Sequence, residues 1–274
     1  MVAPRLHVLT AEASNDAVIL RRGPTRQVAS IGWNRATDAF ELGQWFNGRI
    51  YEHRSDLSPD GRHLVYFAGK GGLPDGRPPW WTAISRAPYL HAVAFLPQTH
   101  TWHGGGAFTP TGEVFLNGGG TLPAGADGLV QAPSDAMPHG TDGFHMGGLY
   151  AAMMKRRGWR SDDRPGYDVK LWRTLESGWQ VELTFEISAK NRTIIANRYA
   201  LVRPGQVRVE YPGWEWAEAW HDGLHFAEQG ALHFTHIGRD GQLKDRRLIR
   251  DFSGMTFERL RAPYDRRDET EDRS

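Results

Sequence analysis

The sequence predicts an all-β protein in which small antiparallel sheets repeat along the chain and pack radially, as in a β-propeller. One observation is a hairpin phrase, clearest at residues 56–68 (DLSPDGRHLVYFA), that returns in weaker form at 107–116 and 225–234. In each copy an aromatic residue or a leucine precedes a glycine by four positions, and strand-forming residues follow. Recurring units of this kind indicate a repeat architecture.

The second observation is that apolar and polar residues alternate between turn signals. Dipeptides of the Asp-Gly and Asn-Gly type recur from residue 47 to residue 241, and they accept the positive φ angles of tight hairpin turns. The segment 181–187 alternates without interruption, and 207–211 does so more briefly. A period of two is typical of half-buried strands and not of helices.

A third observation groups the strands into units. The tripeptide apolar-any-Arg occurs at 19–21, 84–86, 171–173 and 248–250, each time with another apolar strand after it. With the hairpins it predicts four-stranded units at about 6–33 (without an opening strand), 56–96, 107–187 and 224–260, and a degraded unit near 192–216. We therefore expect a single propeller domain over 1–264, most simply with five blades of three to four strands, with four or six blades as alternatives.

The phrase at 57–66 (LSPDGRHLVY) also resembles the hairpin motif of TolB-type, WD40-like propeller repeats. The other copies depart from it, with Thr111-Gly112 or Gln229-Gly230 where the first has Asp60-Gly61. The resemblance implies the propeller fold and carries no functional residues.

A long insertion interrupts the third unit at 118–167, where a short loop would suffice. It is rich in Gly, Pro, Asp and His and then favours a helix over 149–157, with Gly148 before it and Gly158 to end it. A connection of this length is usually functional or disordered. The charged tail at 265–274 has no apolar residues and is predicted to be disordered.

Composition excludes several classes of function. The formal net charge of +1 gives no long-range field that would recruit nucleic acid or an anionic membrane surface. The absence of cysteine excludes thiolate nucleophiles and cysteine-based zinc sites, and no motif points to a cofactor. The first twenty residues lack an apolar signal region, and no apolar stretch is long enough to cross a bilayer. We expect a soluble, cytoplasmic protein of undetermined oligomeric state.

Motifs with specific chemistry are few. His103-Gly104-Gly105-Gly106 is similar to the oxyanion-hole phrase of lipase-type hydrolases, but the chain has no Gly-x-Ser-x-Gly nucleophile elbow. We interpret these glycines as a close backbone approach beside an inner strand. His139, Asp142 and His145 could supply metal ligands from one irregular segment, and they form a weak metal candidate.

The stronger functional signal is positional. In a four-stranded blade, the loops after strands two and four share one face, which assigns 34–55, 69–81, 97–106, 118–167 and 212–223 to that face. These loops hold Trp45, Trp80, Trp81, Trp102, His103, Trp214, Trp216, Trp220 and His221. Because exposed tryptophan offers apolar area and one donor at low entropic cost, we predict a non-enzymatic recognition module that binds a protein or peptide partner there. The structural alternative is that each indole packs between blades of a scaffold.

The alternative function is a propeller-type hydrolase or lyase that acts on a carbohydrate or other small substrate in the central channel. It would use Asp56, Asp222, His103 and His221, with acids on innermost strands as in propeller glycosidases. Asp56 also has a structural explanation, since it can cap the turn that follows it. An enzyme predicts acids and histidines that converge on one channel end, whereas a recognition module predicts exposed indoles around a rim.

Overall fold

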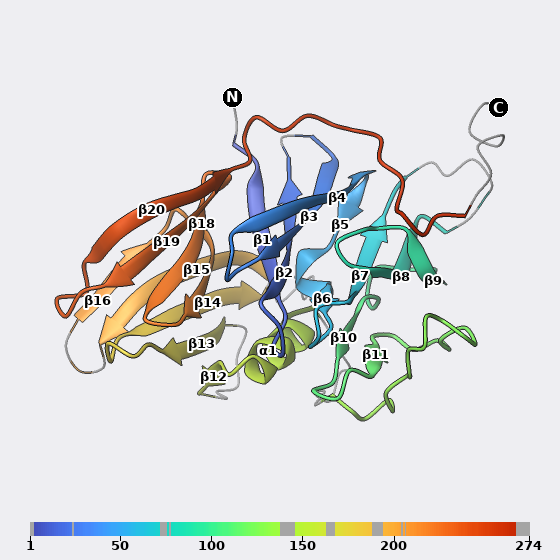
Figure 1. The fold of residues 1–274 in the computed structure, drawn as a ribbon. Coiled ribbons are helices and arrows are strands. Elements are labelled where there is room, and N and C mark those ends of the chain that lie inside the picture. The colour runs from blue at the N-terminus through green and yellow to red at the C-terminus, as the bar shows by residue number, and fades with distance from the viewer. Residues whose placement is uncertain are drawn as a thin grey trace.

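The computed structural model describes residues 3–23, 25–71, 76, 78–137, 146–162, 168–187, 194–203, 205 and 207–266. Four antiparallel sheets of four or five strands stand around a common centre as the blades of a β-propeller (Figure 1). A two-stranded sheet and one α-helix lie between the second and third blades. The predicted all-β propeller is confirmed. No helix among the described residues is long and apolar enough to cross a bilayer.

The elements follow one another around the ring in chain order. The first blade contains β1 (Arg5–Thr10), β2 (Asp16–Arg22), β3 (Gln27–Asn34) and β4 (Ala39–Asn47). The second contains β5 (Arg49–Ile50), the 3-10 helix η1 (Glu52–Arg54), β6 (Asp56–Leu57), β7 (His63–Gly69), β8 (Trp80–Arg86) and β9 (Ala92–Gln98). Then come β10 (Gly106–Phe108), β11 (Val114–Leu116) and α1 (Met146–Arg156). The third blade contains β12 (Arg160–Ser161), β13 (Asp168–Thr174), β14 (Gln180–Ile187), β15 (Ile194–Arg203) and β16 (Val207–Tyr211). The fourth contains β17 (Trp214–Trp220), β18 (Gly223–Glu228), β19 (Ala231–Ile237) and β20 (Leu243–Asp251).

Burial falls from the inner strand of a blade to its outer strand. β1 and β17 are buried along most of their length, whereas β4 and β20 are largely half-exposed or exposed. β1 lies against β17 on one side and β6 on the other, and β6 contacts β10. Helix α1 contacts β10 and β13, and β15 contacts β17, so the packing continues around the whole ring. Each blade thereby buries its inner strand against its neighbours.

The expected five blades are wrong: there are four. After β11 no further strand among the described residues joins that sheet; Gln131 forms a parallel bridge with Val114, and α1 packs Leu149 and Met153 into the core instead. Because a helix satisfies its own backbone hydrogen bonds, it can close this sector of the ring without outer strands. β13 and β14, expected to complete the sheet begun at 107, belong instead to one sheet with β12, β15 and β16, in which β14 pairs with β15. The apolar-any-Arg tripeptides therefore lie on non-equivalent strands.

A buried ion-pair cluster ties α1 into the ring. Asp56 on β6 is fully buried, and its carboxylate pairs with Arg156 at 3.0 Å and also with Arg157. The same carboxylate accepts a hydrogen bond of 2.8 Å from the backbone N–H of Phe108 on β10. A buried charge persists only with such compensation. Asp56 thus joins β6, β10 and α1, which is a structural role.

Residues 252–266, here called the strap, leave β20 and cross the first blade toward the second (Figure 1). Buried Arg21 on β2 donates through Nε to the backbone oxygen of Phe252 at 3.1 Å. The Tyr264 hydroxyl donates to the backbone oxygen of His91 in the second blade at 2.7 Å. The start of the tail predicted to be disordered, Asp265 and Arg266, belongs to this strap, and residues 267–274 lie outside the described residues.

Candidate functional site

The tryptophans predicted to form one aromatic loop face lie mostly on strands. Trp45 is on β4, Trp80 and Trp81 are on β8, and Trp214, Trp216 and Trp220 are on β17. Trp81, Trp214 and Trp216 are buried, Trp45, Trp80 and Trp220 are half-buried, and Trp102 is 60% exposed. The expected loop at 212–223 is therefore wrong for β17; three aromatic residues within seven positions favour a strand, and this signal could have been recognised. Partner binding through the remaining exposed indole stays a prediction.

The residues named for the enzymatic alternative are separated in the fold. Asp56 is enclosed in the ion-pair cluster beneath α1, whereas His221 and Asp222 occupy the exposed β17–β18 turn. His103 lies in the loop before β10. The metal candidates His139, Asp142 and His145 lie outside the described residues. Within the described part of the chain, no group of three or more His, Cys, Asp or Glu side chains could hold a metal ion.

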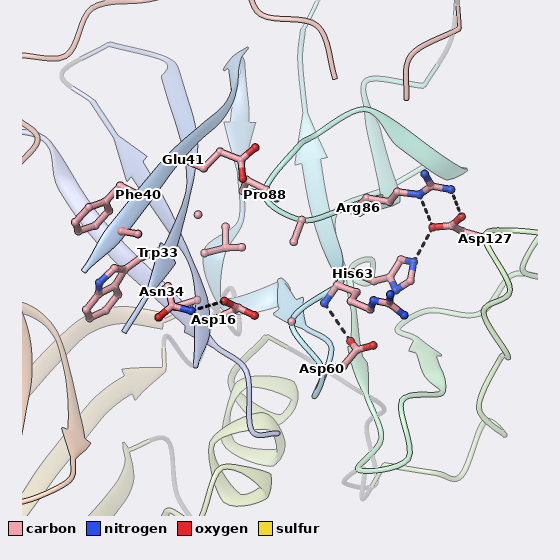
Figure 2. Close-up of a pocket in the computed structure, with 17 residues that line it drawn as sticks. Asp16, Trp33, Asn34, Phe40, Glu41, Asp60, His63, Arg86, Pro88 and Asp127 are labelled. Carbon is pink, nitrogen blue, oxygen red and sulfur yellow. Dashed lines mark hydrogen bonds and ion pairs between the residues drawn. The ribbon is translucent and has the colours of Figure 1, made fainter. Parts of the chain in front are cut away.

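A groove of about 700 Å³ opens between the first and second blades (Figure 2). Its first-blade wall carries Asp16 at the start of β2, Asn34 at the end of β3, and Phe40 and Glu41 on β4. The opposite wall consists of the β6–β7 turn (60–63), the segment after β8 (86–88) and Asp127 from the connection after β11. Three stretches far apart in the sequence thus meet at one inter-blade junction. A groove of this volume accommodates a ligand or a peptide side chain with its flanking backbone.

Two glycines set how closely the blades approach at this junction. A Cβ on Gly43 would lie 2.3 Å from the backbone oxygen of Pro88, and a Cβ on Gly32 would lie 3.1 Å from the Pro88 ring. The turn after β8 can therefore rest directly on β3 and β4. Phe40 stacks on buried Trp33 with their rings 6.2 Å apart and nearly parallel, which fixes an apolar strip beside the polar groups.

A hydrogen-bonded triad closes the far side of the groove, as the dashed lines in Figure 2 show. His63 Nε2 lies 2.8 Å from Asp127 Oδ2, and Arg86 Nε donates to the same oxygen at 2.8 Å. These bonds, first that from Arg86 and then that from His63, hold the pKa of the Asp127 carboxyl well below its ordinary value. The charge of Asp127 is thus neutralised by its neighbours, and the triad fastens the connection after β11 to the second blade.

The other carboxylates of the groove have only neutral donors. Asp16 accepts hydrogen bonds from Asn34 Nδ2 at 3.2 Å and from a serine hydroxyl, and Glu41 accepts one from the Tyr89 hydroxyl. Asp60 accepts from the Ser58 hydroxyl at 2.6 Å and from a backbone N–H. Among the described residues, none of these three carboxylates forms an ion pair. In the described part of the chain, the groove therefore has three carboxylates without an ion pair. Burial raises the pKa of the Asp60 carboxyl, but its hydrogen bonds and the nearby charges of His63 and Arg62 hold that pKa below its ordinary value.

Sequence reasoning assigned 60–63 to a hairpin turn but gave it no functional role, and it missed Asp16 and Glu41 altogether. No sequence signal links these residues, because they are distant along the chain and lie on opposite walls. The Asp60-Gly61 turn is the only part of the groove that sequence reasoning identified, and it was identified as a hairpin turn.

Comparison with known proteins assigns no family. No protein-family model and no curated protein matches the chain. Among solved structures, an uncharacterised protein from Listeria monocytogenes EGD-e shares 8% identity with a TM-score of 0.27, over 89% of this chain and 66% of that one. A functionally unknown protein from Desulfotomaculum acetoxidans DSM 771 shares 7% identity with a TM-score of 0.26, over 88% of this chain and 68% of that one.

A third solved structure is of a Bacteroides uniformis ATCC 8492 protein provisionally described as a 6-phosphogluconolactonase. It shares 12% identity with a TM-score of 0.22, over 88% of this chain and 84% of that one. This chain spans 66% of the length of the Listeria protein. Likenesses this low carry no argument about function, and the TolB-type character of the repeats stays a prediction.

Proposed function

We propose that this protein is a non-enzymatic recognition module that binds a basic peptide segment of a protein partner in the groove between the first two blades. The observation that carries the proposal is the excess of carboxylates on the groove walls. Among the described residues, Asp16, Glu41 and Asp60 form no ion pair, and the nearby Arg62 supplies the groove with one guanidinium that likewise forms none. A lysine or arginine side chain of the partner would donate charge-assisted hydrogen bonds to these carboxylates.

The shape of the groove suits a peptide. Phe40 and Pro88 give apolar surface beside the carboxylates, and the stem of a long basic side chain can pack there while its charged end reaches the acids. The walls belong to two blades that approach closely at Gly32 and Gly43 and that the strap connects. The groove is therefore preformed, and little ordering accompanies binding.

One observation favours the enzymatic alternative, a hydrolase or lyase acting on a small substrate. The bond between His63 and Asp127 is the arrangement that orients a general base. However, the groove lining contains no serine, threonine or cysteine that could act as a nucleophile beside it. Turnover of chromogenic glycosides or esters that disappears in His63→Gln would favour this alternative over recognition.

The proposal is tested with two capped tripeptides, acetyl-Gly-Arg-Gly-amide and acetyl-Gly-Glu-Gly-amide, titrated by calorimetry and followed by amide chemical shifts. We expect the arginine peptide to bind and the glutamate peptide not to bind. The double variant Asp16→Asn/Glu41→Gln should lose about tenfold or more in affinity, which is about 1.4 kcal/mol. Glu176→Gln, an exposed acid on the β13–β14 turn, is the matched control. Equal binding of both peptides, or no loss in the double variant, contradicts the proposal.

The predicted aromatic face is tested separately with Trp102→Ala/Trp220→Ala. Capture of partners from the native lysate should depend on the groove acids and not on these two tryptophans, if the groove is the recognition surface. Loss of the same partners only in the tryptophan variant would mean that the surface around Trp102 and Trp220, and not the groove, binds the partner.

A further inference from the structure

A second cavity, of about 450 Å³, lies where all four blades meet. Its lining comes from the first blade (β1 to β3), from β5 and η1 of the second, from β15 of the third and from the start of β17 in the fourth. A cavity bordered by every blade lies at one end of the propeller axis. We call it the axial pocket. It shares no lining residue with the groove.

Three arginines surround the axial pocket. Arg5 and Arg22 are directly opposite each other in the β1–β2 ladder, and Arg49 lies at the start of β5. Like charges directly opposite on neighbouring strands destabilise a sheet. The Arg49 guanidinium lies over the Tyr51 ring at 4.5 Å, which holds it beside the pocket. The fold thus gathers three guanidinium groups at one pocket.

The two carboxylates of the pocket are already engaged. Glu52 pairs with Arg22 at 3.1 Å. Glu215 accepts a hydrogen bond of 2.8 Å from the backbone N–H of Leu6; burial raises the pKa of its carboxyl, and backbone hydrogen bonds and the nearby Arg5 partly offset that effect. Among the described residues, Arg5 and Arg49 form no ion pair. Within this part of the chain, Arg49 therefore has no carboxylate partner and Arg5 has only the longer-range charge of Glu215, so both guanidinium groups can donate hydrogen bonds to an external oxyanion.

The wall opposite the arginines is polar but uncharged. Asn197 Nδ2 lies 3.1 Å from His53 Nε2, and Asn197 Oδ1 is buried without any hydrogen-bond partner. Burial lowers the pKa of both His7 and His53, so both imidazoles are neutral near pH 7. A buried acceptor without a partner is costly, and a ligand hydroxyl would satisfy it.

We propose that the axial pocket binds a small hydroxylated oxyanion, a hydroxycarboxylate or a phosphate monoester of a polyol, with Arg5 and Arg49 on its charged end and Asn197 Oδ1 accepting from its hydroxyl. The guanidinium fork matches both carboxylate and phosphate oxygens, so the two sources share one chemistry. The volume admits a compact metabolite and not a peptide chain.

Calorimetric titration with L-malate, succinate and glycerol 3-phosphate, each at matched ionic strength, tests the proposal and separates the two sources. Malate or glycerol 3-phosphate should bind, and malate should bind more tightly than succinate, which lacks the hydroxyl. Arg5→Gln/Arg49→Gln should weaken binding by about tenfold or more. Asn197→Leu should remove the preference for malate over succinate. Arg259→Gln, an exposed arginine of the strap, should bind as the wild type does.

Absence of binding by all three probes up to the millimolar range overturns the proposal. So does equal affinity in wild type and the double arginine variant, provided that both melt cooperatively. Equal affinity for malate and succinate in the wild type would remove the assigned role of Asn197 and overturn the hydroxyl part of the proposal. None of these outcomes bears on peptide binding in the groove, which is measured with different probes and variants.

Discussion

Strand β2 connects the two cavities, and its ends have opposite charge. Asp16 begins the strand in the groove, and Arg22 ends it in the axial pocket, which at the rise of a strand places them about 20 Å apart. In the groove, Asp16 forms no ion pair; in the axial pocket, Arg22 is paired with Glu52, whereas Arg5 and Arg49 form no ion pair among the described residues. The net charge of the whole chain, +1, conceals this separation. The class of ligand that each cavity suits therefore depends on how the charged residues are distributed between the cavities, and not on the net charge of the chain.

The middle of β2 belongs to neither cavity. Residues 17–21 are buried, and Arg21 is used to hold the strap through the backbone oxygen of Phe252. The two ends of the strand are therefore held rigidly with respect to one another, and their separation of about 20 Å exceeds the Debye length of about 8 Å, so surrounding salt screens one charge from the other. We expect ligands in the two cavities to bind independently.

The largest expected effect comes from the ion-pair cluster that joins β6, β10 and α1. Asp56→Ala leaves the buried guanidinium of Arg157 without its carboxylate, and we expect it to lower the free energy of unfolding by about 3–5 kcal/mol. Urea denaturation measures this loss. The control Glu176→Gln should change stability by less than about 0.5 kcal/mol. A small effect of Asp56→Ala would show that α1 is held by its apolar contacts alone.

Reversing one charge in each cavity tests their independence. Asp16→Lys should weaken binding of the arginine tripeptide by more than about tenfold and leave malate binding unchanged. Arg49→Glu should do the converse. Calorimetric titration of both ligands against both variants measures the four effects. If either variant alters both affinities alike, the two cavities are coupled, which contradicts the expectation that their ligands bind independently.

Acid should destabilise the protein through its buried histidines. Burial lowers the pKa of His7 in the axial pocket and lowers that of His225 beneath Trp220 to about 3. The unfolded chain takes up protons at these residues near pH 6.5, while the folded chain resists protonation. These histidines therefore leave the free energy of unfolding unchanged above about pH 6.5. As the pH decreases below about 6.5, each of them lowers it with a slope on the order of 1 kcal/mol per pH unit.

Urea denaturation between pH 6.5 and 4.5 measures that slope. His7→Gln should give a shallower pH dependence than the wild type, whereas Glu176→Gln should run parallel to it. An unchanged slope in His7→Gln would mean that this imidazole is protonated equally in the folded and unfolded chains.

The smallest expected effect is a gain in stability. Arg5→Gln removes one of two like charges that face each other across β1 and β2, and it should raise the free energy of unfolding by about 0.2–1 kcal/mol at low salt. The gain should shrink at high salt, because the repulsion is screened. A loss of stability in thermal melts would show that Arg5 is compensated within the protein, which weakens the argument for an external oxyanion.

Particular elements show how far sequence reasoning reached. The alternating segments at 181–187 and 207–211 became β14 and β16, and the helix expected at 149–157 is α1 at 146–156. These succeed because local periodicity alone specifies them. β17 was missed because WEWAEAW has no clear period of two and its tryptophans were interpreted as loop residues. The groove residues could not have been found, since Asp16, Glu41 and Asp127 have no common local pattern.

The amino-acid sequence by itself determined the strongly alternating strands, the tight turns and helix α1, since these depend on side-chain period and on the conformational freedom of Gly, Asn and Asp within a few residues. Only the tertiary structure decided the number of blades, the replacement of outer strands by α1, and the division of charge between groove and axial pocket. Those features depend on contacts between residues distant along the chain, such as Asp56 with Arg157 or Pro88 with Gly43, and no local pattern encodes which of the alternative pairings buries the most surface.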